Sequence, residues 1–181
     1  MPVHAKEFLD TIFDSLADDE YVCVSRAIEK KDGTGFWFKS FKRDARQWRK
    51  WNPETQDQAW YFCVSSVNGE LNEKGSMVGR GRSNLKQYFC LTLDDIGTKA
   101  TNPPVRPSWI VETSPGNYQW GYLLDPGNEW GRYEAVVEYC HQQGWGDAGA
   151  GGSYRLMRVP GSANIKAGRN NFHSVITEWD L

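Results

Sequence analysis

The sequence is 181 residues long and has a mass of 20.7 kDa, which suits one domain of ordinary size. Its 39% hydrophobic and 14% aromatic content exclude an intrinsically disordered chain, and no apolar run is long enough for a membrane-spanning helix. The net charge of −2 indicates no class of partner by itself, so charge is considered segment by segment. The polar residues 1–7 are not typical of a signal peptide, and we expect a soluble cytoplasmic protein.

The predicted elements are mostly strands, with a few helices between them and no internal repeat. Apolar residues at helical spacing predict a helix over residues 6–18, and a second helix is predicted over residues 129–143, ending at Gly144. Short β-rich runs predict strands at residues 21–27, 36–38, 61–67, 88–93, 109–112, 118–124, 154–159 and 172–179. We therefore expect one α+β domain over residues 1–181, with a central, mostly antiparallel sheet flanked by helices.

The spacing of the cysteines and histidines predicts neither a structural zinc site nor a hydrolase active site. Cys23, Cys63, Cys90 and Cys140 are far apart and form no CxxC pair, whereas a structural zinc site needs thiolates at short spacing. We expect buried free thiols in a reducing compartment. The three histidines belong to no nucleophile motif, and neither GxSxG nor HExxH occurs, so a hydrolase is not predicted.

Two basic segments are candidates for contact with a nucleic-acid backbone. Residues 39–51 contain six Lys or Arg with aromatic residues among them, and residues 70–86 add four more in a loop or short helix. The DNA-binding candidates are Arg43, Arg46, Arg49, Arg80 and Arg82. For residues 39–51 alone, a solvated helix face with tryptophans in the core is the better explanation of the pattern.

Three further segments contain residues that could carry chemistry. Asp94 and Asp95 end an apolar strand before a glycine, an arrangement that suits a hard cation or else a solvated acidic turn. Because strand residues alternate between faces, both carboxylates share one face only if the strand is interrupted there. Residues 112–119 are typical of a hairpin turn. Residues 149–169 are rich in glycine and basic residues, which suits an anion or a mobile loop.

In this order, three segments resemble the primase-polymerase domains of the archaeo-eukaryotic primase superfamily, and within it the RepB-like primases of phages and plasmids. They are residues 93–99 (LDDIGTK), 112–119 (ETSPGNYQ) and 155–166 (RLMRVPGSANIK), of which the last is the most specific. The resemblance implies a catalytic core like an RNA-recognition motif. It also implies template-directed nucleotidyl transfer on single-stranded DNA, with Mg²⁺ or Mn²⁺, during phage or plasmid replication in a bacterial host.

The same resemblance assigns roles to individual residues. Asp94 and Asp95 would be the catalytic metal ligands, and Asp147, or less favourably Glu112, would replace the third acid of the superfamily. The nucleotide-binding residues would be Lys99, Ser114, Asn117, Gln119, Arg155, Arg158, Asn164 and Lys166. The implied partners are a single-stranded DNA template, nucleoside triphosphates and a replicative helicase, with no membrane. The chain would be a primase-polymerase-like domain, either alone or as the N-terminal part of a longer replication protein.

The sequence departs from the superfamily pattern in two ways that keep other hypotheses open. The two acids of the first motif are usually separated by one residue, whereas Asp94 and Asp95 are adjacent. Gln119 occupies the place of a histidine, so it can hydrogen-bond a phosphate but carries no positive charge. A catalytically silent module that binds single-stranded or origin DNA is therefore the alternative. A protein-binding domain with exposed tryptophans is a third.

Overall fold

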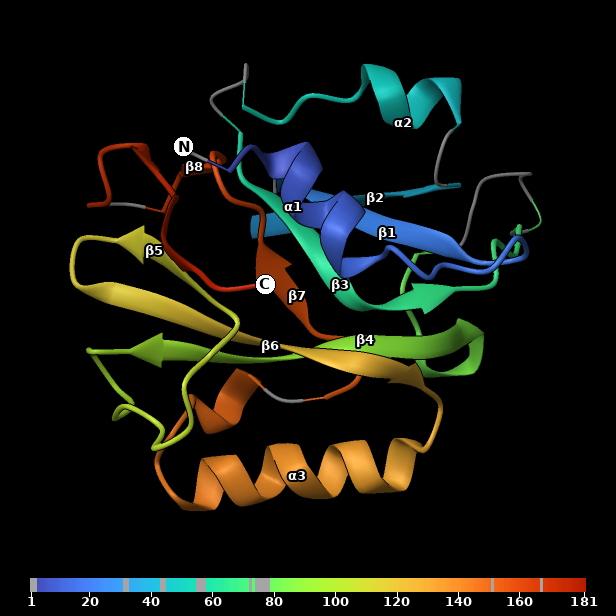
Figure 1. The fold of residues 1–181 in the computed structure, drawn as a ribbon. Coiled ribbons are helices and arrows are strands. Elements are labelled where there is room, and N and C mark those ends of the chain that lie inside the picture. The colour runs from blue at the N-terminus through green and yellow to red at the C-terminus, as the bar shows by residue number, and fades with distance from the viewer. Residues whose placement is uncertain are drawn as a thin grey trace.

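The computed structural model describes residues 3–30, 33–42, 45–54, 58–71, 73, 79–150, 152–166 and 168–181. Most of this part of the chain forms an antiparallel sheet, with helices on either side of it (Figure 1). The expected α+β fold with a mostly antiparallel sheet is therefore confirmed. No helix among the described residues is both long enough and apolar enough to cross a membrane.

The main sheet has eight strands within the described residues, in the order β10-β5-β6-β4-β3-β1-β2, and β7 pairs with β3 beside this path. Its strands are β1 (Tyr21–Lys30), β2 (Gly33–Phe41), β3 (Trp60–Val67), β4 (Leu85–Ile96), β5 (Trp109–Ser114), β6 (Asn117–Gly127), β7 (Leu156–Arg158) and β10 (Val175–Trp179). A small second sheet pairs β8 (Ala163–Asn164) with β9 (Phe172–His173). The helical elements are α1 (Ala5–Ile12), α2 (Arg46–Lys50) and α3 (Trp130–Gln142), with 3₁₀ turns η1 (Arg82–Asn84) and η2 (Ala148–Ala150).

One face of the sheet packs against α1 through aromatic side chains. The buried residues of α1 follow helical spacing at Ala5, Phe8, Leu9 and Ile12. The Phe8 ring makes edge-to-face contacts with Phe62 of β3 and Trp109 of β5, at 5.6 and 5.3 Å between ring centroids. Burial of these large rings stabilises the packing of α1 on the sheet.

The helix α3 covers the other side of the sheet, below β4 and β6 in Figure 1. Its Tyr133 stacks on Tyr88 of β4 at 5.0 Å, and the Tyr133 hydroxyl donates a hydrogen bond to the Cys90 carbonyl at 3.0 Å. The helix ends as expected before Gly144, whose φ of +74° is favourable for glycine. The helix α3 therefore supports β4, which pairs with β6, and the ends of these two strands carry the candidate site.

The structure refines several local predictions. The helix predicted over residues 6–18 ends at Ile12, and the next residue, Phe13, is the C-cap with a non-helical backbone and a buried side chain. The basic segment 39–51 contributes the end of β2 and α2, where Trp48 is buried and stacks on Trp51 at 5.4 Å. This packing favours the interpretation with tryptophans in the core. All four cysteines are buried free thiols, as expected.

Candidate functional site

The strand β4 is interrupted at the two adjacent aspartates. Asp95 has a φ of +59°, and the pairing of β4 with β6 shifts register between Leu93 and Ile96. The Asp94 carboxylate accepts a hydrogen bond from the Asp95 backbone N–H at 2.9 Å, which stabilises this left-handed turn. The interruption removes the strict alternation of a strand, so both carboxylates can contribute to one site.

Arg155 binds the first of these aspartates. Its Nη2 lies 2.9 Å from Asp94 Oδ2, and the two side chains are only 16% and 21% exposed. Burial lowers the pKa of Arg155, and the nearby negative charges, chiefly that of Asp94, oppose this shift. The Asp94 carbonyl also accepts the backbone N–H of Asp147 at 3.2 Å. Arg155 and Asp147 therefore both contact Asp94 from segments far away in the sequence.

Lys99 connects the second aspartate with the third. Its Nζ lies 2.6 Å from Asp95 Oδ2 and 3.3 Å from Asp147 Oδ2, while the lysine side chain is 66% exposed. These two hydrogen bonds raise the pKa of Lys99, with that from Asp95 as the larger cause. Asp95 and Asp147 thus share a single cation. We call Asp94, Asp95, Asp147, Lys99 and Arg155 the acid cluster.

Asp95 keeps its negative charge in this setting. Partial burial would raise the pKa of its carboxyl, but hydrogen bonds from Lys99 and Asn117, with the charges of Lys99 and Lys166, outweigh burial and hold the pKa below its usual value. Asn117 donates from Nδ2 to Asp95 Oδ1 at 3.1 Å. The carboxylate is therefore available as an anionic ligand at neutral pH.

The β5–β6 hairpin, which its turn residues predict, brings Asn117 to the acid cluster. Asn117 also donates to Thr113 Oγ1 at 3.1 Å and accepts from Thr98, so the hairpin turn is tied to the loop after β4. Ser114 is buried, and its Oγ has no hydrogen-bond partner among the described residues. A buried hydroxyl without a partner is unusual and is a candidate contact for a ligand.

Two of the predicted phosphate-binding residues have internal partners. Arg158 is 4% exposed and donates to the Ala163 carbonyl at 2.8 Å and to the Tyr61 hydroxyl at 2.9 Å. Asn164 is also buried and donates to the Thr113 carbonyl at 2.8 Å. Both residues therefore hold the segment 156–164 against the sheet. Their contact with phosphate stays a prediction.

Gln119 and Lys166 differ in their freedom to meet a ligand. Gln119 is buried, and its Oε1 accepts the backbone N–H of Arg158 at 3.0 Å. Lys166 is exposed, and its positive charge lowers the pKa of Asp95. Lys166 is therefore a solvent-accessible cation whose charge acts on Asp95, and the Gln119 side-chain oxygen supports the backbone of β7.

The predicted DNA-binding arginines fall into two groups. Arg80 and Arg82 lie beside the turn that carries Arg155, since Arg80 donates to the Tyr154 carbonyl and Arg82 lies 3.6 Å from Glu134. Arg46 and Arg49 lie on α2, which is on the opposite side of the molecule from α3 in Figure 1. Arg43 lies outside the described residues. Only the first group adjoins the acid cluster.

The acid cluster fits a hard divalent cation through two carboxylates. No group of three or more His, Cys, Asp or Glu among the described residues is arranged to hold a metal ion. However, Asp95 and Asp147 already share the Lys99 ammonium, and Mg²⁺ in phosphoryl-transfer sites is commonly held by one or two carboxylates, waters and substrate phosphates. The donor chemistry and the shared cation position therefore suit Mg²⁺ or Mn²⁺.

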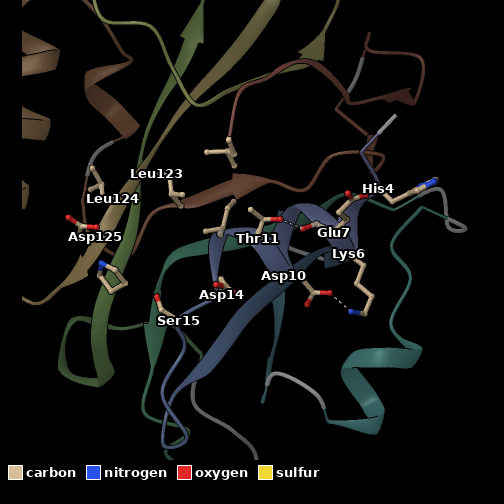
Figure 2. Close-up of a pocket in the computed structure, with 13 residues that line it drawn as sticks. His4, Lys6, Glu7, Asp10, Thr11, Asp14, Ser15, Leu123, Leu124 and Asp125 are labelled. Carbon is tan, nitrogen blue, oxygen red and sulfur yellow. Dashed lines mark hydrogen bonds and ion pairs between the residues drawn. The ribbon is translucent and has the colours of Figure 1, made fainter. Parts of the chain in front are cut away.

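A pocket of about 900 Å³ lies elsewhere, between α1 and the last residues of β6 (Figure 2). Its lining carries the carboxylates of Glu7, Asp10, Asp14 and Asp125, with Lys6 paired to Asp10. Carboxylates without enough cations repel phosphate, so this pocket is not suited to a nucleotide or to DNA. The acid cluster, rather than this pocket, is the candidate site.

Some residues of the site were not predicted from the sequence. Thr98 and Thr113 position Asn117, and Tyr61 receives a hydrogen bond from Arg158. The threonines lie next to predicted residues, so proximity to the motifs could have found them. Tyr61 lies 97 residues before Arg158, and only the pairing of β3 with β7 brings the two together.

Comparison with known proteins agrees with the fold. The primase-polymerase (PrimPol) AEP domain of cyanophage S-2L shares the fold with a TM-score of 0.61 at 13% identity, over 94% of this chain and 86% of that chain. The catalytic domain of primase RepB′, solved in complex with initiator DNA, gives a TM-score of 0.60 at 15% identity, over 97% of this chain and 83% of that chain. No curated protein has a significant match to the chain.

The sequence also matches a family model over more than half of its length. The matched residues are 66–175, which include Asp94, Asp95, Asp147 and the β5–β6 hairpin. The fold expected from the resemblance to RepB-like primases is therefore confirmed, and this chain belongs to the family of RepB DNA-primase N-terminal domains.

Proposed function

We propose that this domain is a nucleotidyltransferase that synthesises or extends primers on single-stranded DNA, using nucleoside triphosphates with Mg²⁺ or Mn²⁺. The observation that carries the proposal is the sharing of one cation by Asp95 and Asp147, beside Asp94. A divalent cation held by these carboxylates would activate the attacking hydroxyl and neutralise the leaving pyrophosphate. Membership of a primase family agrees with a role in DNA replication.

The residues of this chain would divide the remaining work. Lys166 and Lys99 are exposed cations that can pair with triphosphate oxygens next to the carboxylates. Asn117 keeps Asp95 in place, and Arg155 does the same for Asp94. Ser114 Oγ, which has no partner among the described residues, is free to donate a hydrogen bond to a phosphate oxygen. Positioning and charge neutralisation supply most of the catalysis in phosphoryl transfer.

The test is a primer-synthesis and primer-extension assay on single-stranded DNA with Mg²⁺ or Mn²⁺. Asp95→Asn keeps the size of the side chain and removes its charge, so we expect the variant to lose at least about a hundred-fold in rate. Asp125→Asn, an exposed acid of β6 in the pocket of Figure 2, is the matched control and should keep the wild-type rate. Full synthesis by Asp95→Asn would contradict the proposed site.

A second candidate is a catalytically silent module that binds single-stranded DNA. It is favoured by one observation, namely that each aspartate of the acid cluster already contacts a cation of the chain itself. In the same assay this candidate predicts no product from the wild type, together with retained, salt-dependent binding of a single-stranded oligonucleotide. Product from the wild type would exclude it.

A further inference from the structure

A short turn before β7 is anchored on both sides. The Ser153 backbone N–H and Oγ both donate to Glu134 Oε1, at 3.0 and 2.8 Å, and Ser65 Oγ donates to the Ser153 carbonyl. The Arg155 backbone N–H closes the turn by donating to the Gly152 carbonyl at 3.0 Å. Bonds to α3 and to β3 therefore fix the backbone on which the next side chain stands.

That side chain is the aromatic ring of Tyr154, which stays at the surface. It is 37% exposed, and the Arg80 guanidinium carbon lies 5.3 Å from the ring centroid. Arg80 also donates from Nη1 to the Tyr154 carbonyl, so the cation is held at the ring by a second contact. An exposed ring on a fixed turn pays little conformational entropy when a flat ligand stacks on this ring–guanidinium pair.

The surroundings of the ring favour an anionic, flat ligand. Arg80 lies on the ring, and the next residue in the chain, Arg155, pairs with Asp94 of the acid cluster. Arg82, 75% exposed, lies 3.6 Å from the same Glu134 that anchors the turn. Proteins that bind single-stranded nucleic acid commonly combine a row of cations with exposed aromatic rings. The bases stack on the rings, and the phosphates pair with the cations.

We infer that Tyr154 is a base-stacking residue for single-stranded DNA, with Arg80 as its partner, at the edge of the acid cluster. The inference rests on the proposed function, in that it names a template-binding residue of the same site. Arg155, which pairs with Asp94, directly follows Tyr154 in the chain, so the stacking ring stands on the same turn as a residue of the acid cluster.

Tyr139 provides a matched control on a different surface. It is also an exposed tyrosine, at 54%, and its ring contacts Trp145 edge-to-face at 5.8 Å. It stands on α3, and no cation lies over its ring among the contacts of the described residues. The variant Tyr139→Ala therefore also removes an exposed aromatic ring, as Tyr154→Ala does, but it leaves the turn that bears Tyr154 unchanged.

The experiment measures binding of two fluorescent strands of equal length, about 12 nucleotides, within the usual footprint of one single-strand binding domain. One strand is oligo(dT), and the other has the same backbone without bases. The proteins are the wild type, Tyr154→Ala, Tyr154→Phe and Tyr139→Ala. We expect Tyr154→Ala to bind oligo(dT) at least about five-fold more weakly and the abasic strand unchanged, because base stacking is lost and phosphate contacts remain. Tyr154→Phe and Tyr139→Ala should resemble the wild type.

Each other outcome has a distinct meaning. Equal weakening of both strands by Tyr154→Ala would overturn the inference, since the ring would then only support the backbone of the turn. Unchanged binding of oligo(dT) by Tyr154→Ala would overturn the inference as well. In that case the proposed function would still stand, because the wild type binds DNA. Failure of the wild type to bind either strand would overturn both. The salt dependence of Tyr154→Ala should equal that of the wild type, because the number of phosphate contacts is the same.

Discussion

Arg155 and Asp94 form an ion pair across 61 residues of sequence, with the guanidinium Nη2 at 2.9 Å from the carboxylate. The pair joins the turn before β7 to the interrupted end of β4. Both side chains are mostly buried, so each charge depends on the other for compensation. This contact holds the acid cluster and the turn bearing Tyr154 in one arrangement.

Arg155→Met should destabilise the domain by about 2 kcal/mol, between the values typical of exposed and fully buried pairs, because it leaves the Asp94 charge partly buried without its partner. Asp94→Asn should cost a similar amount. The double variant should recover about 1 kcal/mol of the summed loss, because neither charge then remains. Urea unfolding of all four proteins measures this coupling, and strictly additive losses would show that the two charges do not interact.

Lys99→Ala should strengthen the binding of Mn²⁺ in the absence of nucleotide. The lysine ammonium competes for the Asp95 and Asp147 oxygens, and removal of a unit charge at such a distance in a solvated site gives an effect of about five-fold. Lys86, an exposed lysine paired with Asp19 at 2.8 Å, supplies the control variant Lys86→Ala. Electron paramagnetic resonance of free Mn²⁺ reports the affinity. Weaker binding by Lys99→Ala would mean that the lysine helps to hold the ion.

The metal-free domain should become less stable as the pH is lowered, because Asp95 becomes protonated. The folded-state pKa of this carboxyl is lowered, so its contribution is present above the unfolded value of about 4 and is lost as pH falls through the folded value. Asn117→Ala removes one of the hydrogen bonds that lower the pKa, and the pKa should therefore move up. Carboxyl NMR titration in the presence of a chelator measures the Asp95 pKa in the wild type and in the variant. An unchanged Asp95 pKa in this variant would contradict the assigned cause.

Gly121→Ala should destabilise the core by about 2 kcal/mol, the usual cost of overpacking. A Cβ at this position of β6 would lie 1.9 Å from the Trp109 ring, which itself packs on Phe8. Gly131 of α3 is the opposite case, because nothing lies within 4 Å of its added Cβ. Gly131→Ala should therefore stabilise the domain by about 0.5–1 kcal/mol through helix propensity. Thermal unfolding of the two variants should shift in opposite directions.

The sequence was sufficient for the local features that depend on nearby residues. The β5–β6 hairpin followed from its turn residues, and the end of α3 followed from Gly144. The adjacency of Asp94 and Asp95 indicated a site only on the condition that the strand is interrupted. The φ of +59° at Asp95 meets that condition, but aspartate adopts this conformation only in a minority of cases, so the residue type alone does not locate the interruption.

Contacts between distant segments could not be derived in the same way. The bridge from Lys99 to Asp147 depends on the path of the chain through α3, and the bond from Arg158 to Tyr61 depends on the position of β7 beside β3. For the same reason, the hydrogen bond that the Gln119 side-chain oxygen accepts from the Arg158 backbone was not foreseen, and the contact of Gln119 with a nucleotide stays a prediction. Tertiary register, and not residue type, decided these roles.

The third acid reaches the site through a bond from main chain to main chain. The Asp147 N–H donates to the Asp94 carbonyl, and the Gly144 carbonyl, three residues earlier, accepts from the Thr101 N–H at 2.8 Å. A backbone bond is indifferent to the side chains of both residues. In protein engineering, a graft between Gly144 and Asp147 must therefore keep the length of this segment, and it must also keep a glycine at position 146, where a Cβ would lie 3.2 Å from Leu93.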